Sequence, residues 1–205
     1  MANPALLPVV ETFHSLQGEG HHAGRSAFFI RLAGCNVGCP WCDTKHSWPA
    51  SAHNKQSPDE LAGLCSEAAQ AGAAFVVVTG GEPLHHNLNL LTQSLKQRTA
   101  LPIHLETSGV DQLSGNFDWI TLSPKRHQPP CKELLERCHE LKVVVHQPED
   151  VSFAVEMGER CPAGTERLLQ PGWDSPTGVT LALSHVQRHP HWRLSLQSHK
   201  WLNIR

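Results

Sequence analysis

Short apolar segments, several of them rich in β-branched residues, alternate along the chain with stretches in which leucine and alanine recur at helical spacing. Apolar runs bounded by Gly, Pro and Ser predict buried strands, and helical spacing predicts amphipathic helices. We expect strands at 27–32, 75–79, 103–107, 119–123, 141–145, 167–170 and 192–197. Helices are expected around 57–72, 88–95, 132–139, 151–157 and 179–188.

Two of the predicted helices have clear boundary signals. Ser57, followed by Pro58 and Glu60, provides an N-cap, a proline at the first helical position and the glutamate of a capping box. Gly72 is placed to end that helix, and Asn87 is expected to cap the next one.

Strands that alternate with helices predict right-handed βαβ units and a parallel sheet. Polar and glycine-containing segments follow several strands directly, after Leu32, after Thr79, at 108–109 and at 123–125. Ligands collect at the carboxyl ends of parallel strands, so we expect these segments to form one site. A closed eightfold barrel usually needs about 250 residues. The sequence therefore favours an α/β fold with a shortened, incomplete, open (β/α) barrel, in a single domain spanning 1–205.

Charge and hydropathy narrow the class of protein. The chain has 17 Lys and Arg residues against 19 Asp and Glu residues, which argues against a nucleic-acid partner. No apolar run reaches the roughly 18 residues that a membrane span needs, and the first residues lack the basic segment of a signal peptide. We therefore expect a cytoplasmic protein with no membrane partner.

Three of the seven cysteines lie close together, in the pattern Cys35-x3-Cys39-x2-Cys42. An odd number of cysteines without a secretion signal indicates a reducing compartment rather than a disulfide framework. Soft thiolates select iron–sulfur clusters, zinc or copper. Three ligands without a fourth nearby favour a [4Fe–4S] cluster with one open iron; the alternative is a zinc knuckle completed by a histidine such as His46.

The residues around the cysteines resemble the radical S-adenosylmethionine (SAM) superfamily. Trp41 precedes the last cysteine, and Thr79-Gly80-Gly81-Glu82-Pro83 follows the next predicted strand, like the glycine-rich motif of that superfamily. A lone Gly-Gly-Glu-Pro is an ordinary turn composition. With the cysteine motif one capped helix upstream, the resemblance is specific.

Further motifs, spread over nearly the whole chain, resemble the 7-carboxy-7-deazaguanine synthase family. The resemblance implies conversion of 6-carboxy-5,6,7,8-tetrahydropterin to 7-carboxy-7-deazaguanine with loss of ammonia, in 7-deazapurine (queuosine) synthesis. It also implies a [4Fe–4S] cluster, SAM and Mg²⁺ as cofactors, a homodimer, and a flavodoxin- or ferredoxin-type electron donor. The segments that carry it are Phe13, 15–20, 29–32, 42–46, 106–109, 123–125, 169–171 and 192–200.

The resemblance also assigns roles to individual residues. The cluster ligands would be Cys35, Cys39 and Cys42, and the hydroxyl of Thr44 would ligate Mg²⁺. SAM would contact Trp41, Cys42, Asp43, Gly81, Glu82, Ser123, Pro124, Lys125, Gln170 and Pro171. The pterin substrate would contact Leu16, Gln17, Gly18, Glu19, Arg31, Thr79, His199 and Arg205.

Simpler interpretations remain for several of these residues. Arg31 could form an ordinary ion pair within the barrel instead of holding the substrate carboxylate, and Thr44 could hydrogen-bond the backbone. The whole chain could instead be an activating enzyme that installs a glycyl radical on a partner protein, or a non-catalytic zinc module.

The C-terminal segment 192–205 is expected to contribute to the active site through His199 and the carboxylate of Arg205. Trp201, Leu202 and Ile204 are apolar, and an apolar composition is costly for a loose tail. We therefore expect these three side chains to pack against the rest of the protein. The simpler interpretation is a tail that only covers the barrel.

Overall fold

The computed structural model describes residues 6–205. The chain forms two compact units, which we call the first unit and the second unit. The first unit comprises the chain up to Ser15 together with 25–107 and 113–119, and the second unit comprises 16–24, 108–112 and 120–205. The prediction of a single domain stays a prediction. None of the helices in residues 6–205 is long and apolar enough to cross a membrane.

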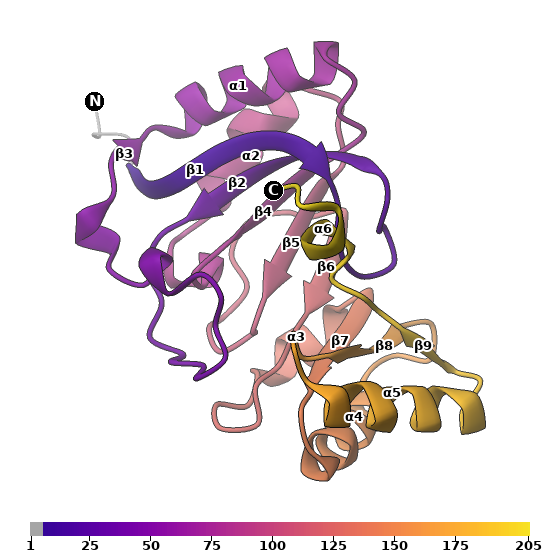
Figure 1. The fold of residues 1–205 in the computed structure, drawn as a ribbon. Helices are drawn as coiled ribbons and strands as arrows, with labels where there is room; N and C mark the ends of the chain where they lie inside the picture. Colours follow the sequence, from indigo (N-terminus) through magenta and orange to yellow (C-terminus); the bar gives the residue numbers. More distant parts are fainter. Residues whose placement is uncertain (1–5) are drawn as a thin grey trace. The chain divides into compact units, whose positions relative to one another are not determined.

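The first unit is an α/β layer with its strands in the order β3-β1-β2-β4-β5. Strands β2, β4 and β5 run parallel, with Phe29 opposite Val77 and Val77 opposite His104. Helices α1 and α2 lie side by side against this unit (Figure 1). Its elements are β1 (Leu7–Leu16), β2 (Ser26–Leu32), η1 (Lys45–Ser47), η2 (Ala50–Ala52), β3 (Lys55–Gln56), α1 (Pro58–Gln70), β4 (Val76–Gly80), η3 (Pro83–His85), α2 (Asn89–Arg98) and β5 (Ile103–Thr107).

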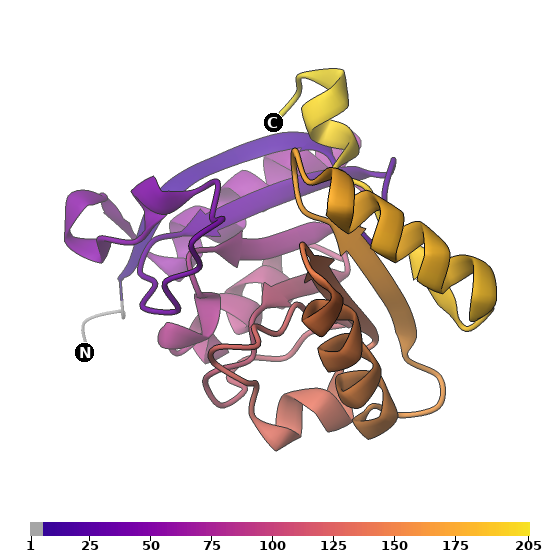
Figure 2. The same cartoon turned by 60° about the horizontal axis from the view of Figure 1, so that its bottom comes forward.

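The second unit has its strands in the order β6-β7-β8-β9, all parallel. Helices α4 and α5 pack against β7 and β8 and against each other (Figure 2). The elements are β6 (Trp119–Leu122), α3 (Lys132–Arg137), β7 (Glu140–Val145), α4 (Pro148–Arg160), β8 (Glu166–Pro171), α5 (Pro176–Arg188), β9 (Trp192–Leu194) and α6 (Ser198–Leu202).

Apolar strand residues form the interior of each unit, as their sequence predicts. In the first unit Phe29, Phe75 and Val77 pack into one cluster, against which Phe13 of β1 stacks at 4.8 Å between ring centroids of Phe13 and Phe29. In the second unit Leu141 and Val143 of β7 are buried, as are the facing side chains of α4, Phe153, Ala154 and Met157. Burial of such side chains is the main stabilising contribution to each layer.

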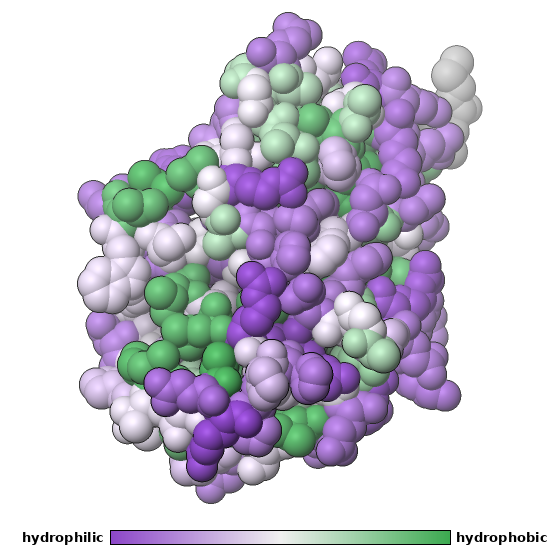
Figure 3. Space-filling model, turned by 90° about the vertical axis from the view of Figure 1, so that its right-hand side faces the viewer, coloured by the Kyte–Doolittle hydropathy of each residue, from purple (hydrophilic) through white to green (hydrophobic). Residues whose placement is uncertain are grey.

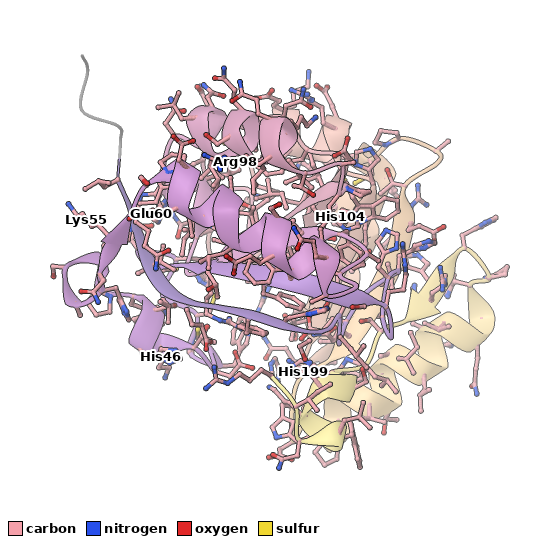
Figure 4. The ribbon with its side chains drawn as sticks, turned by 90° about the horizontal axis from the view of Figure 1, so that it is seen from above. His46, Lys55, Glu60, Arg98, His104 and His199 are labelled. Atoms are coloured by element: carbon pink, nitrogen blue, oxygen red, sulfur yellow. The ribbon has the colours of Figure 1, made fainter. Side chains whose placement is uncertain are left out.

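The predicted boundary signals of α1 are confirmed. The Ser57 hydroxyl accepts a hydrogen bond from the Glu60 N–H at 3.3 Å, and the Glu60 carboxylate accepts from the Ser57 N–H at 2.7 Å. Gly72 follows the helix with a φ of +97°, which an L side chain rarely adopts. Figure 4 shows Glu60 at the N-terminal turn of α1.

Several predicted boundaries are wrong. The N-cap of α2 is Leu88 rather than Asn87; Leu88 is fully buried, and the Asn87 side chain still accepts from the Asn89 N–H at 3.0 Å. The last strand ends at Leu194 instead of residue 197; directly after it, the Ser195 N–H donates to the Leu169 carbonyl at 2.9 Å and the Ser195 hydroxyl donates to Oε1 of Gln170 at 2.8 Å. Sequence reasoning also missed β1, whose apolar start gives way to a polar half, together with β3 and α6.

We predict that Ser57→Ala lowers the free energy of unfolding by about 1 kcal/mol, because the first turn of α1 loses its capping box. Urea denaturation measures this change. Ser66→Ala, inside the same helix, is the matched control and should be neutral or slightly stabilising, since alanine has the higher helix propensity. Equal losses in both variants would contradict the capping role.

Candidate active site

The cysteine loop after β2 and the glycine turn after β4 are joined by backbone hydrogen bonds. The Gly81 N–H donates to the Leu32 carbonyl at 2.9 Å, and the Glu82 N–H donates to the Gly34 carbonyl at 2.8 Å. A Cβ at position 81 would overlap the Gly34 carbonyl oxygen and lie 2.9 Å from the Cβ of Cys35. Glycine at 81 therefore lets the two loops meet at the carboxyl ends of parallel strands, as predicted.

The three clustered cysteines lie within this loop at different depths. Cys39 is buried, whereas Cys35 and Cys42 are half-buried. Burial raises the pKa of the Cys35 thiol; the negative charges of Glu82 and Cys42 raise it further, although backbone N–H groups of the loop oppose the shift. A bound cation would offset this effect, because metal ligation keeps a thiolate deprotonated.

The donor set suits an iron–sulfur cluster. Three thiols offer the soft ligands that such a cluster takes. Within residues 6–205, no three or more His, Cys, Asp or Glu side chains are gathered closely enough to share one metal ion. A cluster distributes its cysteines over separate irons, so it does not require such a gathering.

Two histidines that sequence reasoning missed hold the start of the cysteine loop. Nε2 of His86 lies 2.7 Å from the Ala33 carbonyl oxygen, and the Asn36 N–H donates to Nε2 of His85 at 3.2 Å. Both histidines directly follow the Gly-Gly-Glu-Pro-Leu segment. Sequence reasoning could have identified them, because they directly follow the glycine-rich motif, which has to lie close to the cysteine loop.

Two carboxylates organise the turn after β4. Glu82 is buried, and its Oε1 accepts from the Leu84 N–H at 3.1 Å and from the Thr107 hydroxyl at 2.5 Å. The Thr79 hydroxyl donates to Oε2 of Glu106 at 2.9 Å. The ends of β4 and β5 are thus held together. The expected contacts of Glu82 with SAM and of Thr79 with substrate stay predictions.

Arg31 forms an ion pair with Glu11, which is the kind of interaction that the simpler interpretation of this residue expects. Nε of Arg31 lies 3.1 Å from Oε1 of Glu11, and the guanidinium carbon lies 5.7 Å from the centre of the Phe13 ring. The ion pair engages the Nε position of the planar group. It orients the guanidinium, whose role toward a substrate carboxylate stays a prediction.

Thr44 lies beside a cysteine of the cluster motif. Its hydroxyl oxygen is 3.5 Å from Sγ of Cys42, and its carbonyl accepts from the Ser47 hydroxyl at 2.7 Å. Trp41 and Asp43, which are expected to contact SAM, are exposed in the same loop.

In the second unit the structure brings together Gln17, Gly18 and His199, three of the residues expected to contact substrate. Both the N–H and the hydroxyl of Ser198 donate to the Gly18 carbonyl at 2.9 Å. A Cβ on Gly18 would overlap the imidazole of His199, which α6 carries (Figure 4). Oε1 of Gln17 accepts from the Glu19 N–H at 3.1 Å.

Glu19 forms an ion pair with Lys142 of β7, a partner that sequence reasoning missed. Burial raises the pKa of Glu19, but the Lys142 ammonium and hydrogen bonds from Lys142, Gln197 and Gln170 outweigh this effect and lower the pKa to about 2. Glu19 is therefore ionised at any physiological pH. Lysine is rarely buried without a partner, and no feature near Lys142 in the sequence indicates one 123 residues away.

The two segments expected to contact SAM in this unit are also structured. Nζ of Lys125 donates to the carbonyl and to the hydroxyl of Ser123, both at 2.8 Å, across Pro124. Gln170 is buried and accepts from the Ser195 hydroxyl at 2.8 Å, and Pro171 ends β8. The segment 123–125 follows β6, as predicted, and Gln170 and Pro171 are the last two residues of β8. The contacts of both segments with SAM stay predictions.

The predicted packing of the C-terminal apolar residues is wrong. Trp201 is 77% exposed, Leu202 60% and Ile204 37%. The segment forms the short helix α6, which ends at Asn203 in the left-handed conformation, and Trp201 meets Trp173 edge to face at 5.8 Å. The helix turns these apolar side chains outward because its contacts to Gly18 are made by Ser198 and His199. Arg205 is exposed, and its expected contact with substrate stays a prediction.

Comparison with known proteins identifies the family. The model of the radical SAM superfamily matches residues 29–152. A protein of Prochlorococcus marinus named 7-carboxy-7-deazaguanine synthase is 51% identical, over 97% of this chain and 98% of its own. One of Synechocystis with the same name is 47% identical, over 97% and 93%.

The chain belongs to the 7-carboxy-7-deazaguanine synthase family of the radical SAM superfamily. The crystal structure of QueE from Escherichia coli matches with a TM-score of 0.80 and 33% identity, over 95% of both chains. The predicted fold class, a shortened, incomplete, open (β/α) barrel of the radical SAM type, is confirmed by this match. The family is a radical SAM enzyme family, so a [4Fe–4S] cluster and SAM are its cofactors, as predicted.

We predict that Cys35→Ala, Cys39→Ala and Cys42→Ala each abolish cluster binding, whereas Cys65→Ala and Cys131→Ala retain it. Burial raises the pKa of the Cys65 thiol to about 12, and the Cys131 thiol donates to the Val110 carbonyl at 3.3 Å. Iron content and visible absorbance after anaerobic reconstitution measure the outcome. A cluster retained in any of the first three variants would contradict the ligand assignment.

We also predict that the stability difference between the wild type and Glu19→Gln falls as the pH falls from about 4.5 to about 2. The pKa of Glu19 is lowered on folding, so its stabilisation is complete above its ordinary value and is lost as the carboxylate protonates. Unfolding free energies at pH 6 and pH 3 measure this. Glu133→Gln, in an exposed pair with Arg137, is the control and should show little difference at either pH.

Proposed function

We propose that this chain converts 6-carboxy-5,6,7,8-tetrahydropterin to 7-carboxy-7-deazaguanine and releases ammonia, as a carbon–nitrogen lyase of 7-deazapurine synthesis. Relatives that bear the name 7-carboxy-7-deazaguanine synthase match nearly the whole chain. The observation that supports it most directly in the structure is the junction of the cysteine loop with Gly81, which only glycine permits.

The chain's own residues bind and orient the reactants. When bound, the cluster and SAM supply hydrogen-atom abstraction by a radical route. The protein must hold the substrate close to the reacting position and keep other hydrogen donors away. Cys35, Cys39 and Cys42 hold the cluster in this proposal. SAM contacts are Trp41, Cys42, Asp43, Gly81, Glu82, Ser123, Pro124, Lys125, Gln170 and Pro171.

The substrate is recognised by its carboxylate and its pterin ring. The guanidinium of Arg31, oriented by Glu11, matches a carboxylate, and the amide of Gln17 matches a ring edge that both donates and accepts. Thr79, Gly18 and His199 complete the proposed contacts, together with Leu16, Glu19 and Arg205.

We propose Thr44 as the protein ligand of Mg²⁺. Mg²⁺ prefers oxygen ligands and uses few from the protein, so one hydroxyl together with substrate oxygens is sufficient. The Thr44 hydroxyl lies next to Cys42, beside the proposed cluster. An ion bound to Thr44 would therefore lie close to the cluster and to a substrate held beside it.

A homodimer is proposed because the second unit exposes many apolar side chains. Large apolar exposed patches often mark interfaces. On the face shown in Figure 3, hydrophobic residues gather among polar ones. A flavodoxin- or ferredoxin-type protein is the proposed electron donor, and the cytoplasm the proposed location. The exposed large apolar residues of the second unit are Leu16, Trp173, Val179, Leu183, Leu196, Trp201, Leu202 and Ile204.

The deciding experiment incubates reconstituted protein with 6-carboxytetrahydropterin, SAM and a reductant under anaerobic conditions. Formation of 7-carboxy-7-deazaguanine and ammonia, followed by absorbance and mass spectrometry, is the expected result. Protein with a full cluster that binds SAM but yields no deazapurine would refute the proposal.

We predict that Arg31→Lys strongly lowers kcat/KM for the pterin, by about tenfold or more, because a lysine keeps the charge but lacks the two-pronged geometry. SAM binding and iron content should stay unchanged. Steady-state kinetics measure the first effect, and equilibrium binding measures the second. Unchanged kcat/KM would leave Arg31 as a structural partner of Glu11 only.

We predict that Thr44→Val, nearly constant in volume, abolishes stimulation of turnover by Mg²⁺. The substitution removes the hydroxyl oxygen and leaves the cysteines intact. Turnover measured with and without Mg²⁺ in both proteins tests it, with iron content as the control. Stimulation that persists in the variant would place the ion elsewhere.

A further inference from the structure

Lys142 and Glu19 form a buried ion pair in the second unit. The Lys142 side chain is 6% exposed and the Glu19 side chain 19%. Lysine at this depth is stable only with a partner that compensates for the loss of its hydration. Lys142 stands on β7, and Glu19 belongs to the segment 16–24, which we call the recognition loop.

Further hydrogen bonds connect the recognition loop to the strands beside β7. Nε2 of Gln197 donates to Oε1 of Glu19 at 2.9 Å. The Gly20 N–H donates to the Ser195 hydroxyl at 2.9 Å, and this hydroxyl donates to Oε1 of Gln170 at 2.8 Å. The loop is therefore held by β7, by β8 and by the segment after β9, through side chains rather than through a β ladder.

Gln17 and Gly18 stand immediately before Glu19 in the recognition loop. The Gln17 side chain accepts from the Glu19 backbone N–H, so the position of Glu19 also fixes the Gln17 amide. His199 packs on Gly18, two residues after Gln197, which belongs to the network. The groups proposed to contact the pterin are thus neighbours of those that the ion pair fixes.

We propose that Lys142 is a positioning residue for substrate recognition, which acts by fixing Glu19 so that Gln17, Gly18 and His199 are held in place for the pterin. The inference rests on the proposed function and deepens it. Glu19 keeps its own proposed contact with the substrate, because its two carboxylate oxygens can accept further hydrogen bonds besides those from Lys142 and Gln197.

A purely structural role would have different consequences. Loss of the ion pair would then lower stability, cluster content and SAM binding together. A positioning role predicts that the KM for the pterin rises while cluster content and kcat change little, because the cysteine loop belongs to the other unit.

The test compares Lys142→Met and Lys142→Arg with the wild type. We expect Lys142→Met to raise the KM for 6-carboxytetrahydropterin about tenfold and Lys142→Arg to restore most of the loss, because arginine keeps the charge and the donors. Lys132→Met, which removes an exposed pair with Glu136 in the same unit, is the matched control and should leave the KM unchanged.

If Lys142→Met does not fold, a second variant, Gln197→Ala, tests the same inference. It removes one hydrogen bond to Glu19 and leaves the charges paired, and we expect a KM about threefold higher. An unchanged KM in folded Lys142→Met or in Gln197→Ala overturns the inference, as does a loss of iron that accompanies the rise in KM. Failure of the proposed function is distinguishable, because the wild type itself would then form no 7-carboxy-7-deazaguanine.

Discussion

Two backbone hydrogen bonds, from the N–H groups of Gly81 and Glu82 to the carbonyls of Leu32 and Gly34, constrain the proposed cluster site. They extend the pairing of β2 with β4 beyond the ends of these strands. The cysteine loop can therefore begin beside the glycine turn without any side chain between them. His85 and His86 then hold the same loop from the segment that follows the turn.

Local signals in the sequence predicted much of the fold. The capping box of Ser57 and Glu60, the β-branched run before Gly80 and the cysteine spacing all act over a few residues, so the chain itself displays them. The predictions failed where tertiary contacts prevail over local preference. Burial of Leu88 shifts a helix start, and the last strand ends at Leu194 rather than at residue 197.

The partners of the site residues could not be predicted in the same way. The resemblance to the family identified Arg31 as a candidate. Its ion pair with Glu11 depends on β1, and the polar second half of this strand hides the apolar pattern that would have predicted it. In the sequence, Lys142 is a single lysine in an apolar strand, and only the structure shows that Glu19 is its partner. Periodicity shows which side of a strand a residue faces. An ion pair between residues 123 positions apart depends on the fold and leaves no local pattern in the sequence.

The seven thiols occupy environments that differ in access to solvent. Cys35, Cys42 and Cys131 are half-buried, whereas Cys39, Cys65, Cys138 and Cys161 are buried. Sγ of Cys138 lies 3.6 Å from Sγ of Cys161, at the ends of two helices, so these sulfurs shield each other. An alkylating reagent applied to the folded protein therefore reaches Cys35, Cys42 and Cys131 before the four buried thiols. Its rate of reaction at Cys35 and Cys42 reports occupancy of the cysteine ligands, and slow later labelling of the buried thiols reports unfolding.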